Sequence, residues 1–230
     1  MSGRGDLTVA AVLFDLYDTL IHASPDNAFY HRVPAALGVG RERWHACYRA
    51  LGRAAMLGEV PDMATRVGLA CRHAGYPVDH EVAAAVVRDQ LPHFYAGIRL
   101  DPQALSTLDQ LRAAGLRLAV VSNAAPASEP LLDILGLRTR VDAVILSCSV
   151  GVLKPDPRIY RAALGALQIG AADAAFVGDG GDNELRGARR LGLRTLLVER
   201  GLPHTGPARA DAVLCCADLA AVQRALLPGG

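Results

Sequence analysis

The chain has little of what marks nucleic-acid-binding, membrane and secreted proteins. Its 24 basic and 23 acidic residues leave a formal net charge of +1, so charge gives no reason to expect binding to nucleic acid or to an anionic membrane. No apolar run approaches the roughly 20 residues of a membrane-spanning helix, and the N-terminal stretch MSGRGDLTVA lacks a secretory signal pattern. These absences predict a cytoplasmic protein that binds neither nucleic acid nor membrane.

Cysteine is scarce, and its spacing matches no zinc site or disulfide framework. The five cysteines are Cys47, Cys71, Cys148, Cys215 and Cys216. We interpret the adjacent pair in the apolar segment AVLCC as two buried small residues and not as a redox couple. Reduced cysteines of this kind fit the cytoplasm.

Apolar β-like runs alternate with helix-like segments from about residue 97 onward. The β-like runs cover residues 116–123, 141–147, 173–181 and 193–199, and a further run of the same type covers 8–14. Helical spacing marks 102–115, 128–136, 156–168 and 183–192, several of which end at a glycine suited to a helix C-terminus, namely Gly115, Gly136 and Gly192. The alternation predicts an α/β fold, a Rossmann-like doubly wound parallel sheet covered by helices on both faces.

Residues 22–96 differ from the rest of the chain. They are rich in Ala, Arg and His at helical spacing, they contain no Lys, and the prolines that interrupt them are Pro25, Pro61, Pro77 and Pro92. No β signal is present between the first strand and residue 97. We therefore predict a helical domain, 22–96, inserted after the first strand of an α/β core made of 1–21 and 97–230. Both a monomer and a homodimer are compatible with this organisation.

Polar clusters follow four of the predicted strands. They are Asp15 to Thr19, Ser122 with Asn123, the region of Lys154, and Asp179 to Glu184. Ligands of open parallel α/β sheets bind beyond the carboxyl ends of the strands, so four clusters at one edge indicate a common site.

These clusters, in this order, resemble the four motifs of the haloacid dehalogenase-like hydrolase superfamily. The matching segments are FDLYDTL, VVSN, GVLKPDPRIY and VGDGGDNELRGA. The helical insert is similar in size and place to the C1 cap domain of that family, and the resemblance covers the whole chain. It implies a hydrolase whose cap closes over a small substrate.

The resemblance also implies roles for individual residues. Asp15 would be the nucleophile that attacks phosphorus and forms an aspartyl-phosphate. Ser122 would donate a hydrogen bond to a phosphate oxygen, and Lys154 would supply a fixed positive charge. Asn123 is expected to position the same loop or to contact the substrate, and we expect Thr19 to support the first loop by a hydrogen bond to its backbone.

Magnesium is the cofactor that the resemblance implies. Asp15, Asp179 and the backbone carbonyl of Tyr17 are the expected ligands, because Mg²⁺ prefers oxygen and shields a phosphoryl group from a carboxylate nucleophile. Glu184 stands where the fuller motif has Asp, and its longer side chain is expected to bind the metal directly or through water.

Two neighbours of Glu184, Asp182 and Asn183, are alternatives for completing the metal site. For Asp182 we favour a different role, as the N-cap of the helix that follows it. In the insert, His22 is the best candidate for a substrate contact, because it directly follows the first motif, where we expect the hinge between the insert and the core.

Tyr17 departs from the phosphatase pattern. Phosphatases of the family usually have Asp at this position as general acid and base, whereas the dehalogenase branch has Tyr. Asp18 is a possible substitute, although it is one residue out of register.

Three functions follow from this motif. We favour a Mg²⁺-dependent phosphatase of a small phosphorylated metabolite, because two carboxylates at the metal position are hard to explain without a cation. The alternatives are a metal-independent 2-haloacid dehalogenase and a weakly active or non-catalytic member that binds a ligand or partner. Phosphonate cleavage is disfavoured, since the insert has no lysine for a Schiff base.

Overall fold

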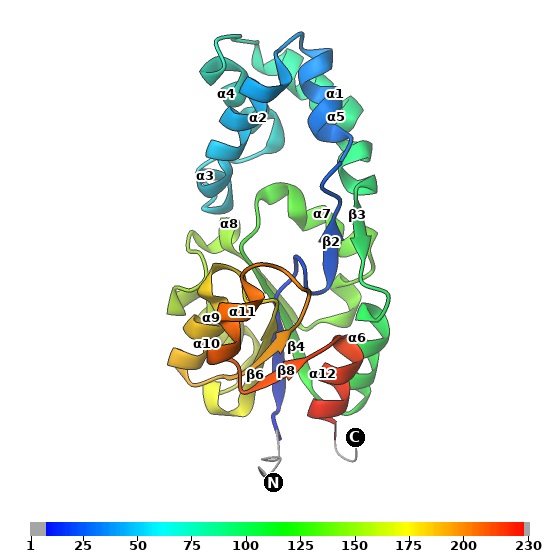
Figure 1. Cartoon of the computed structure of the whole chain (residues 1–230), viewed down its shortest axis with the longest axis vertical. Coiled ribbons are helices and arrows are strands. Elements are labelled where there is room, and N and C mark those ends of the chain that lie inside the picture. Colours follow the sequence, from blue (N-terminus) through cyan, green and yellow to red (C-terminus); the bar gives the residue numbers. More distant parts are fainter. Residues whose placement is uncertain (1–7, 228–230) are drawn as a thin grey trace.

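A six-stranded parallel sheet forms the centre of the larger part of the protein (Figure 1). The computed structural model describes residues 8–227. The strands, in their order across the sheet, are β5 (Ala143–Leu146), β4 (Arg117–Ser122), β1 (Ala11–Phe14), β6 (Ala174–Gly178), β7 (Arg194–Val198) and β8 (Leu214–Cys216). All five neighbouring pairs are parallel. The predicted doubly wound α/β sheet is therefore confirmed, and β8 is a strand that the sequence analysis did not identify.

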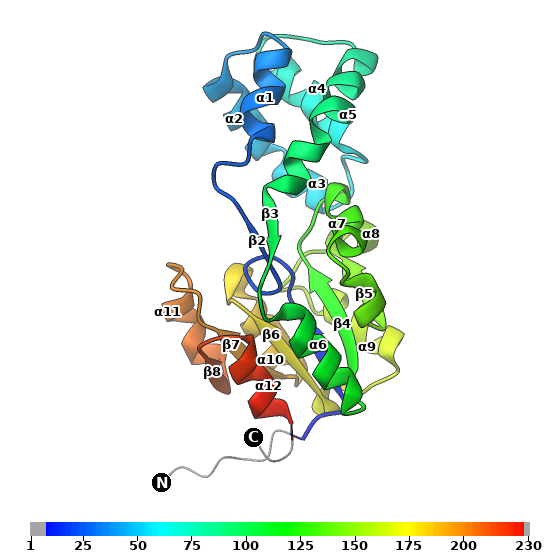
Figure 2. The same cartoon turned by 90° about the vertical axis from the view of Figure 1, so that its right-hand side faces the viewer.

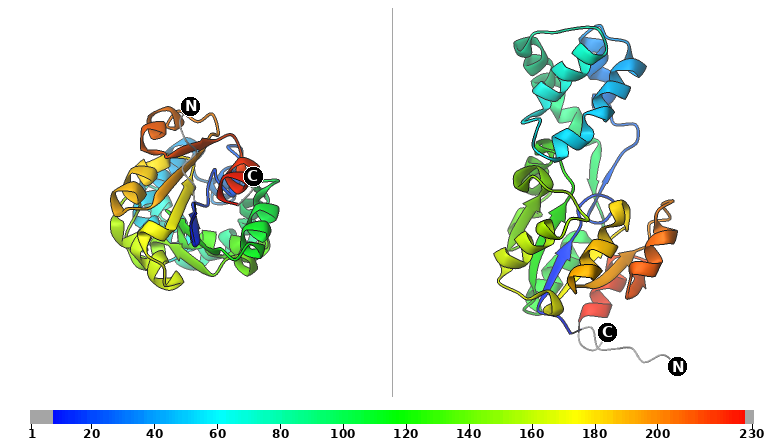
Figure 3. Two further views of the ribbon diagram at one scale, coloured as in Figure 1. Left: turned by 90° about the horizontal axis from the view of Figure 1, so that it is seen from below. Right: turned by 90° about the vertical axis from the view of Figure 1, so that its left-hand side faces the viewer.

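Helices cover both faces of this sheet (Figure 3). The helices after the insert are α6 (Ala104–Ala113), α7 (Glu129–Ile134), α8 (Ser147–Val150), α9 (Pro157–Leu167), α10 (Glu184–Leu191), α11 (Thr205–Ala208) and α12 (Leu219–Leu226). Alternate residues of β1 contribute to two separate cores, as the two-residue period of a strand requires. Val12 and Phe14 share one core with residues of α6 and α12, and Ala11 and Leu13 share the other with residues of α9 and α10.

Five helices lie between β2 (Ile21–Ala23) and β3 (Ile98–Leu100), which pair antiparallel below them. They are α1 (Phe29–Ala36), α2 (Arg41–Ala50), α3 (Gly52–Met56), α4 (Met63–His73) and α5 (His80–Ala96). Figure 1 shows this helical part at the far end of the molecule from the two termini. Trp44 of α2 is fully buried within it. Within residues 8–227, no helix is both long enough and apolar enough to span a bilayer.

Three details of the sequence analysis need correction. β2 lies in a stretch where no β signal was expected, because three residues are too few to show a period. Pro92 does not interrupt the helical region but lies inside α5. Cys215 is exposed and only Cys216 is buried, because neighbouring residues of an edge strand point to opposite faces.

The predicted helix ends are confirmed where glycine or proline sets them. Gly115, Gly136 and Gly192 follow α6, α7 and α10 with φ of 88°, 69° and 100°, a region that favours glycine. Asp156 accepts a hydrogen bond from the backbone N–H of Arg158 at the start of α9, with Pro157 in the first turn. These ends fix where the flanking loops leave the sheet edge.

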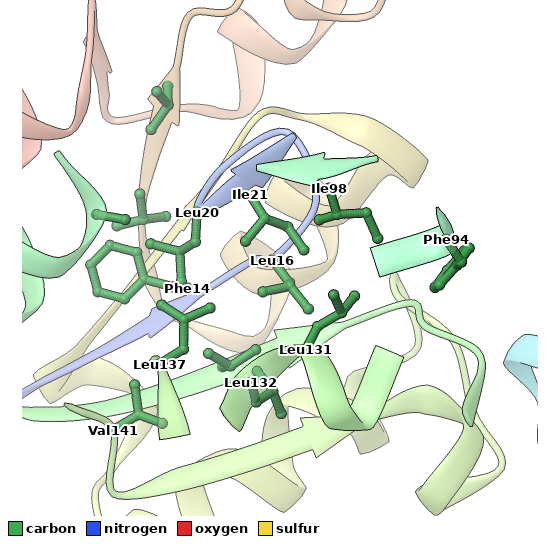
Figure 4. Packing of buried hydrophobic residues seen from close by; sticks show 14 of the residues in the cluster. Phe14, Leu16, Leu20, Ile21, Phe94, Ile98, Leu131, Leu132, Leu137 and Val141 are labelled. Carbon is green, nitrogen blue, oxygen red and sulfur yellow. The ribbon is translucent and has the colours of Figure 1, made fainter. Parts of the chain in front are cut away.

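The loop that carries Asp15 is anchored by apolar side chains. Figure 4 shows Leu16, Leu20 and Ile21 beside Leu131 and Leu132 in one buried cluster. All five side chains are buried. The polar groups of this loop are thus fixed in position by apolar side chains that pack into the core.

The helical part rests on the sheet part where α3 meets α8 (Figure 2). Ser147 Oγ donates a hydrogen bond to the carbonyl of Met56 at 2.6 Å and accepts one from the N–H of Ala124 at 3.0 Å. Gly58 follows α3 with φ of 78°, and a Cβ there would overlap the carbonyl oxygen of Cys148. The contact therefore requires a residue without a side chain at position 58.

Gly58→Ala is expected to destabilise the protein by about 1–3 kcal/mol more than Gly38→Ala. Gly38 has a similar φ of 65°, but nothing lies within 4 Å of its Cβ position, so its substitution carries only the left-handed backbone cost of about 1–2 kcal/mol. Urea denaturation of both variants measures the difference. Equal destabilisation would show that α3 does not rest on Cys148 in solution.

Candidate active site

Three neighbouring strands end in buried polar side chains. Asp15 follows β1, Ser122 ends β4 and Asp179 follows β6, and all three are buried. Since β1 lies between β4 and β6, these residues meet at the carboxyl edge of the sheet, as the strand pattern predicted.

Lys154 lies between two carboxylates. Its Nζ donates to Asp15 Oδ1, and it donates to Glu184 Oε2 at 2.5 Å. Burial alone would lower the pKa of Lys154, but the two carboxylates raise it above its ordinary value. Lys154 is also the only lysine among the 24 basic residues of the chain. The lysine is therefore charged, and both carboxylates face a fixed cation.

The carboxylates at this edge outnumber the buried cation. Asp15, Asp179 and Glu184 each have an oxygen within 4.8 Å of the others. Burial raises the pKa of Asp15 and raises that of Glu184 well above its usual value, against the opposing effect of Lys154. Three buried carboxylates beside one lysine form a site that fits a metal ion, because oxygen donors suit a hard cation and a second positive charge would stabilise their ionised forms.

Glu184 is held at both carboxylate oxygens. Oε2 accepts from Lys154, and Oε1 accepts from the N–H of Gly180 at 3.0 Å. A Cβ on Gly178 would overlap Oε1, so the glycine leaves room for the longer side chain. The extra methylene relative to Asp brings the carboxylate within reach of Lys154.

His204 is a site residue that the sequence analysis missed. Its Nε2 lies 2.7 Å from Asp179 Oδ2, while the other oxygen of Asp179 accepts from the N–H of Gly181 at 3.1 Å. His204 lies in the loop after β7, which leaves the same edge of the sheet. A single histidine in a loop belongs to no motif, so its place after a predicted strand was the only sequence feature that could have indicated His204 as a site residue.

Asn123 connects three segments of the site. Its side chain accepts from the N–H of Lys154 at 2.7 Å and donates to the carbonyl of Lys154 at 3.2 Å and to Asp182 Oδ2 at 2.8 Å. The predicted N-cap role of Asp182 is wrong. Asp182 and Asn183 both have positive φ, in a turn that displaces Asp182 from the cap, and the cap residue Asn183 makes no side-chain cap bond. Asp182 does not belong to the group of three carboxylates.

The first loop differs from expectation at Thr19. Its hydroxyl donates to Asp15 Oδ2 at 3.2 Å, and not to the loop backbone. The carbonyls of Asp18 and Thr19 instead accept from Arg200 at 3.1 and 2.8 Å. Arg200, which the sequence analysis also missed, pairs with the buried Asp101 at 2.8 Å and so fixes the loop.

Asp18 and His22 lie together, and neither belongs to the group of three carboxylates. Asp18 has φ of 58° and a side chain that is 47% exposed, and its Oδ1 is 3.5 Å from His22 Nδ1. The other ring nitrogen of His22 is 3.3 Å from Asp101. Asp18 thus lies in the first loop and His22 lies in β2, which follows that loop.

Tyr17 has a neutral partner. Its hydroxyl lies 3.0 Å from the hydroxyl of Ser128. Burial raises the pKa of Tyr17 to about 12, so this side chain is protonated at neutral pH. Tyr17 therefore lacks the acid–base capacity that Asp would have at this position.

A cavity of about 300 Å³ lies between the strand-end loops and the helical part. Tyr17, Asn123 and Ala124 line it from the loops. Tyr48 of α2 and Arg66 of α4 line it from the helices. The cavity thus joins the first and second motifs to the helical part and is the expected place for a substrate.

Lys154→Met is expected to reduce the free energy of unfolding by about 3–5 kcal/mol at pH 8 and by less at pH 5. Without the lysine, the pKa values of Asp15 and Glu184 rise further in the folded state and stay ordinary in the unfolded state. The folded variant then holds more protons, so its stability falls as the pH rises through this range. Urea denaturation at both pH values, with Arg158→Met as an exposed cation control, measures the effect. Equal losses at the two pH values would contradict it.

The relatives of this chain in sequence include proteins named as phosphatases. The chain is 30% identical over 204 residues to the glyceraldehyde 3-phosphate phosphatase of Methanopyrus kandleri, covering 84% of this chain and 85% of that protein. It is 40% identical over 110 residues to the phosphoserine phosphatase of Thermus thermophilus, a match that spans only 47% of this chain and 44% of the relative.

Solved structures share the fold and belong to both phosphatases and dehalogenases. The 2-haloacid dehalogenase of Pseudomonas syringae pv. Tomato superposes with a TM-score of 0.67 at 22% identity, over 94% of this chain and 97% of that one. The sequence model of the haloacid dehalogenase-like hydrolases matches residues 9–192. Because this match covers all four motifs, the chain belongs to the haloacid dehalogenase-like hydrolases.

Proposed function

We propose that the chain is a Mg²⁺-dependent phosphatase of a small phosphorylated metabolite, with Asp15 as the nucleophile. The observation that carries the proposal is the set of three buried carboxylates around a single buried lysine. Dehalogenation needs the nucleophile but no metal ion, so it does not account for a group of three buried carboxylates that fits one. The curated relatives named as phosphatases support the same choice.

Asp15 is held for attack on phosphorus. Thr19 donates to one of its oxygens and Lys154 to the other, which fixes the carboxylate and favours its ionised form. Attack forms the aspartyl-phosphate and releases the alcohol, and water then cleaves the phosphate from Asp15. Ser122, at the end of β4, is proposed to bind a phosphate oxygen.

Asp15, Asp179, Glu184 and the carbonyl of Tyr17 would hold the Mg²⁺. When bound, the ion supplies positive charge that reduces repulsion between the Asp15 carboxylate and the phosphate. His204 holds Asp179 from the side of the β7 loop, and Lys154 holds both Asp15 and Glu184. These contacts position the carboxylates before any ligand arrives.

Tyr17 supports the second candidate, a metal-independent 2-haloacid dehalogenase. In that reaction Asp15 would attack the halogen-bearing carbon, and no acid would be needed for the departing halide. The cavity beside Tyr17 is lined mainly by apolar and aromatic side chains and has room for a small haloacid. The excess of buried carboxylates is the reason we rank this candidate second.

Phosphate release from p-nitrophenyl phosphate and from sugar and nucleoside phosphates tests the proposal. Turnover is expected with Mg²⁺, and its loss is expected with EDTA or in Asp15→Asn. Chloride release from 2-chloropropionate in EDTA is the parallel assay. Chloride release without phosphate release would replace the phosphatase with the dehalogenase.

Tyr17→Asp is expected to raise kcat on alkyl phosphates such as glycerol phosphate by about 10²-fold or more, because it restores a general acid and base. The gain on p-nitrophenyl phosphate is expected to be smaller, since its leaving group needs little protonation. Tyr17→Asn is the matched control of similar size without an acid. Equal rates in the two variants would show that another group supplies the proton.

A further inference from the structure

The cavity wall contains one charged side chain among its lining residues, and that side chain is positive. Tyr30, Tyr48 and Phe94 form its aromatic wall on the helical side, and Arg66 lies among them. In the part of the chain that the structure describes, no aspartate or glutamate lines the cavity. No residue of this wall can therefore neutralise the positive charge of Arg66, although a cation in apolar surroundings is stabilised by a counter-charge.

The protein holds the Arg66 guanidinium without neutralising it. Nε and Nη2 donate to the carbonyl of Tyr48 at 3.2 and 2.9 Å, and Cζ lies 3.9 Å from the centroid of the Tyr48 ring. Gly52 leaves space beside it, since a Cβ there would lie 3.2 Å from Nη2. Within residues 8–227, no carboxylate lies within ion-pair distance of Arg66.

The neighbouring tyrosines do not supply the missing charge. Burial raises the pKa of both Tyr30 and Tyr48 above the ordinary value, so both hydroxyls are protonated at neutral pH. A guanidinium has five N–H donors, and the two bonds to Tyr48 leave the others for a ligand. The site has the character of an anion receptor whose anion comes from outside the chain.

The geometry points to a substrate with two anionic ends, a carboxylate at Arg66 and a phosphate at the strand-end loops beside Asp15, joined by an apolar body in the cavity that Tyr17 and Asn123 line on the loop side. This inference rests on the proposed function and adds the class of substrate, a phosphate ester of an organic acid. A planar guanidinium binds a carboxylate through two parallel hydrogen bonds, and a single cation matches a single negative charge. Arg66 is then the residue that determines specificity.

Matched pairs of ligands with and without the carboxylate test this inference. The esters are phenyl phosphate and 4-carboxyphenyl phosphate, assayed with Mg²⁺ for kcat and KM. The non-hydrolysable analogues are benzylphosphonate and 4-carboxybenzylphosphonate, whose binding is measured by calorimetry. The variants are Arg66→Gln and Arg66→Lys, with Arg72→Gln as the control, because Arg72 is an exposed arginine on the same helix.

The wild type and Arg72→Gln are expected to prefer the carboxylated member of each pair by about tenfold or more in KM and in Kd. Arg66→Gln is expected to lose this preference in both KM and Kd, whereas Arg72→Gln keeps it. Arg66→Lys is expected to keep part of the preference, which a purely structural role of the arginine would not produce.

The outcomes separate this inference from the proposed function. Hydrolysis of both esters with no preference, or with a preference that survives in Arg66→Gln, overturns the inference and leaves the phosphatase in place. Absence of hydrolysis combined with an Arg66-dependent preference in phosphonate binding supports the two-anion ligand and rejects the phosphatase. Failure of both phosphonates to bind overturns the inference.

Discussion

The ion pairs of Lys154 with Asp15 and Glu184 are the interaction on which the site depends. Each buried carboxylate would be costly alone, and the lysine stabilises two of them from one position. Neighbouring residues hold these three side chains in place. Asn123 holds the backbone of Lys154, Gly180 and Gly178 accommodate Glu184, and Thr19 orients Asp15. The parallel sheet brings these residues from distant parts of the sequence to one edge.

The negative charge that remains after this pairing defines what the site can bind. Asp179 lies 2.7 Å from His204 Nε2, and the group of three carboxylates has only one lysine beside it. In the cavity the imbalance has the opposite sign, since Arg66 lines it and, within residues 8–227, has no carboxylate at ion-pair distance. A substrate that bridges the two regions would meet a metal and a lysine at one end and a guanidinium at the other.

Much of the fold and the principal residues of the site could be predicted from the sequence, for a physical reason. A parallel strand buried on both faces is an apolar run, so the polar residue that ends it stands out, as Asp15, Ser122 and Asp179 do. Residues positioned by tertiary contacts carry no such signal. His204 and Arg200 reach the site from loops that have no sequence motif. The left-handed backbone of Asp182 moves it out of the helix N-cap position. The hydroxyl of Thr19 donates to the side chain of Asp15 and not to the loop backbone. The catalytic roles assigned to these residues, and the division into core and cap, stay predictions.

The scarcity of lysine has a practical consequence for this chain. Lys154 carries the only side-chain amine in 230 residues, and that amine is buried between two carboxylates. A reagent that acylates amines has no surface lysine to consume it, so its reaction with this side chain requires the sheet edge to open. The rate of labelling at this one position therefore reports how often the carboxyl edge of the sheet opens to water.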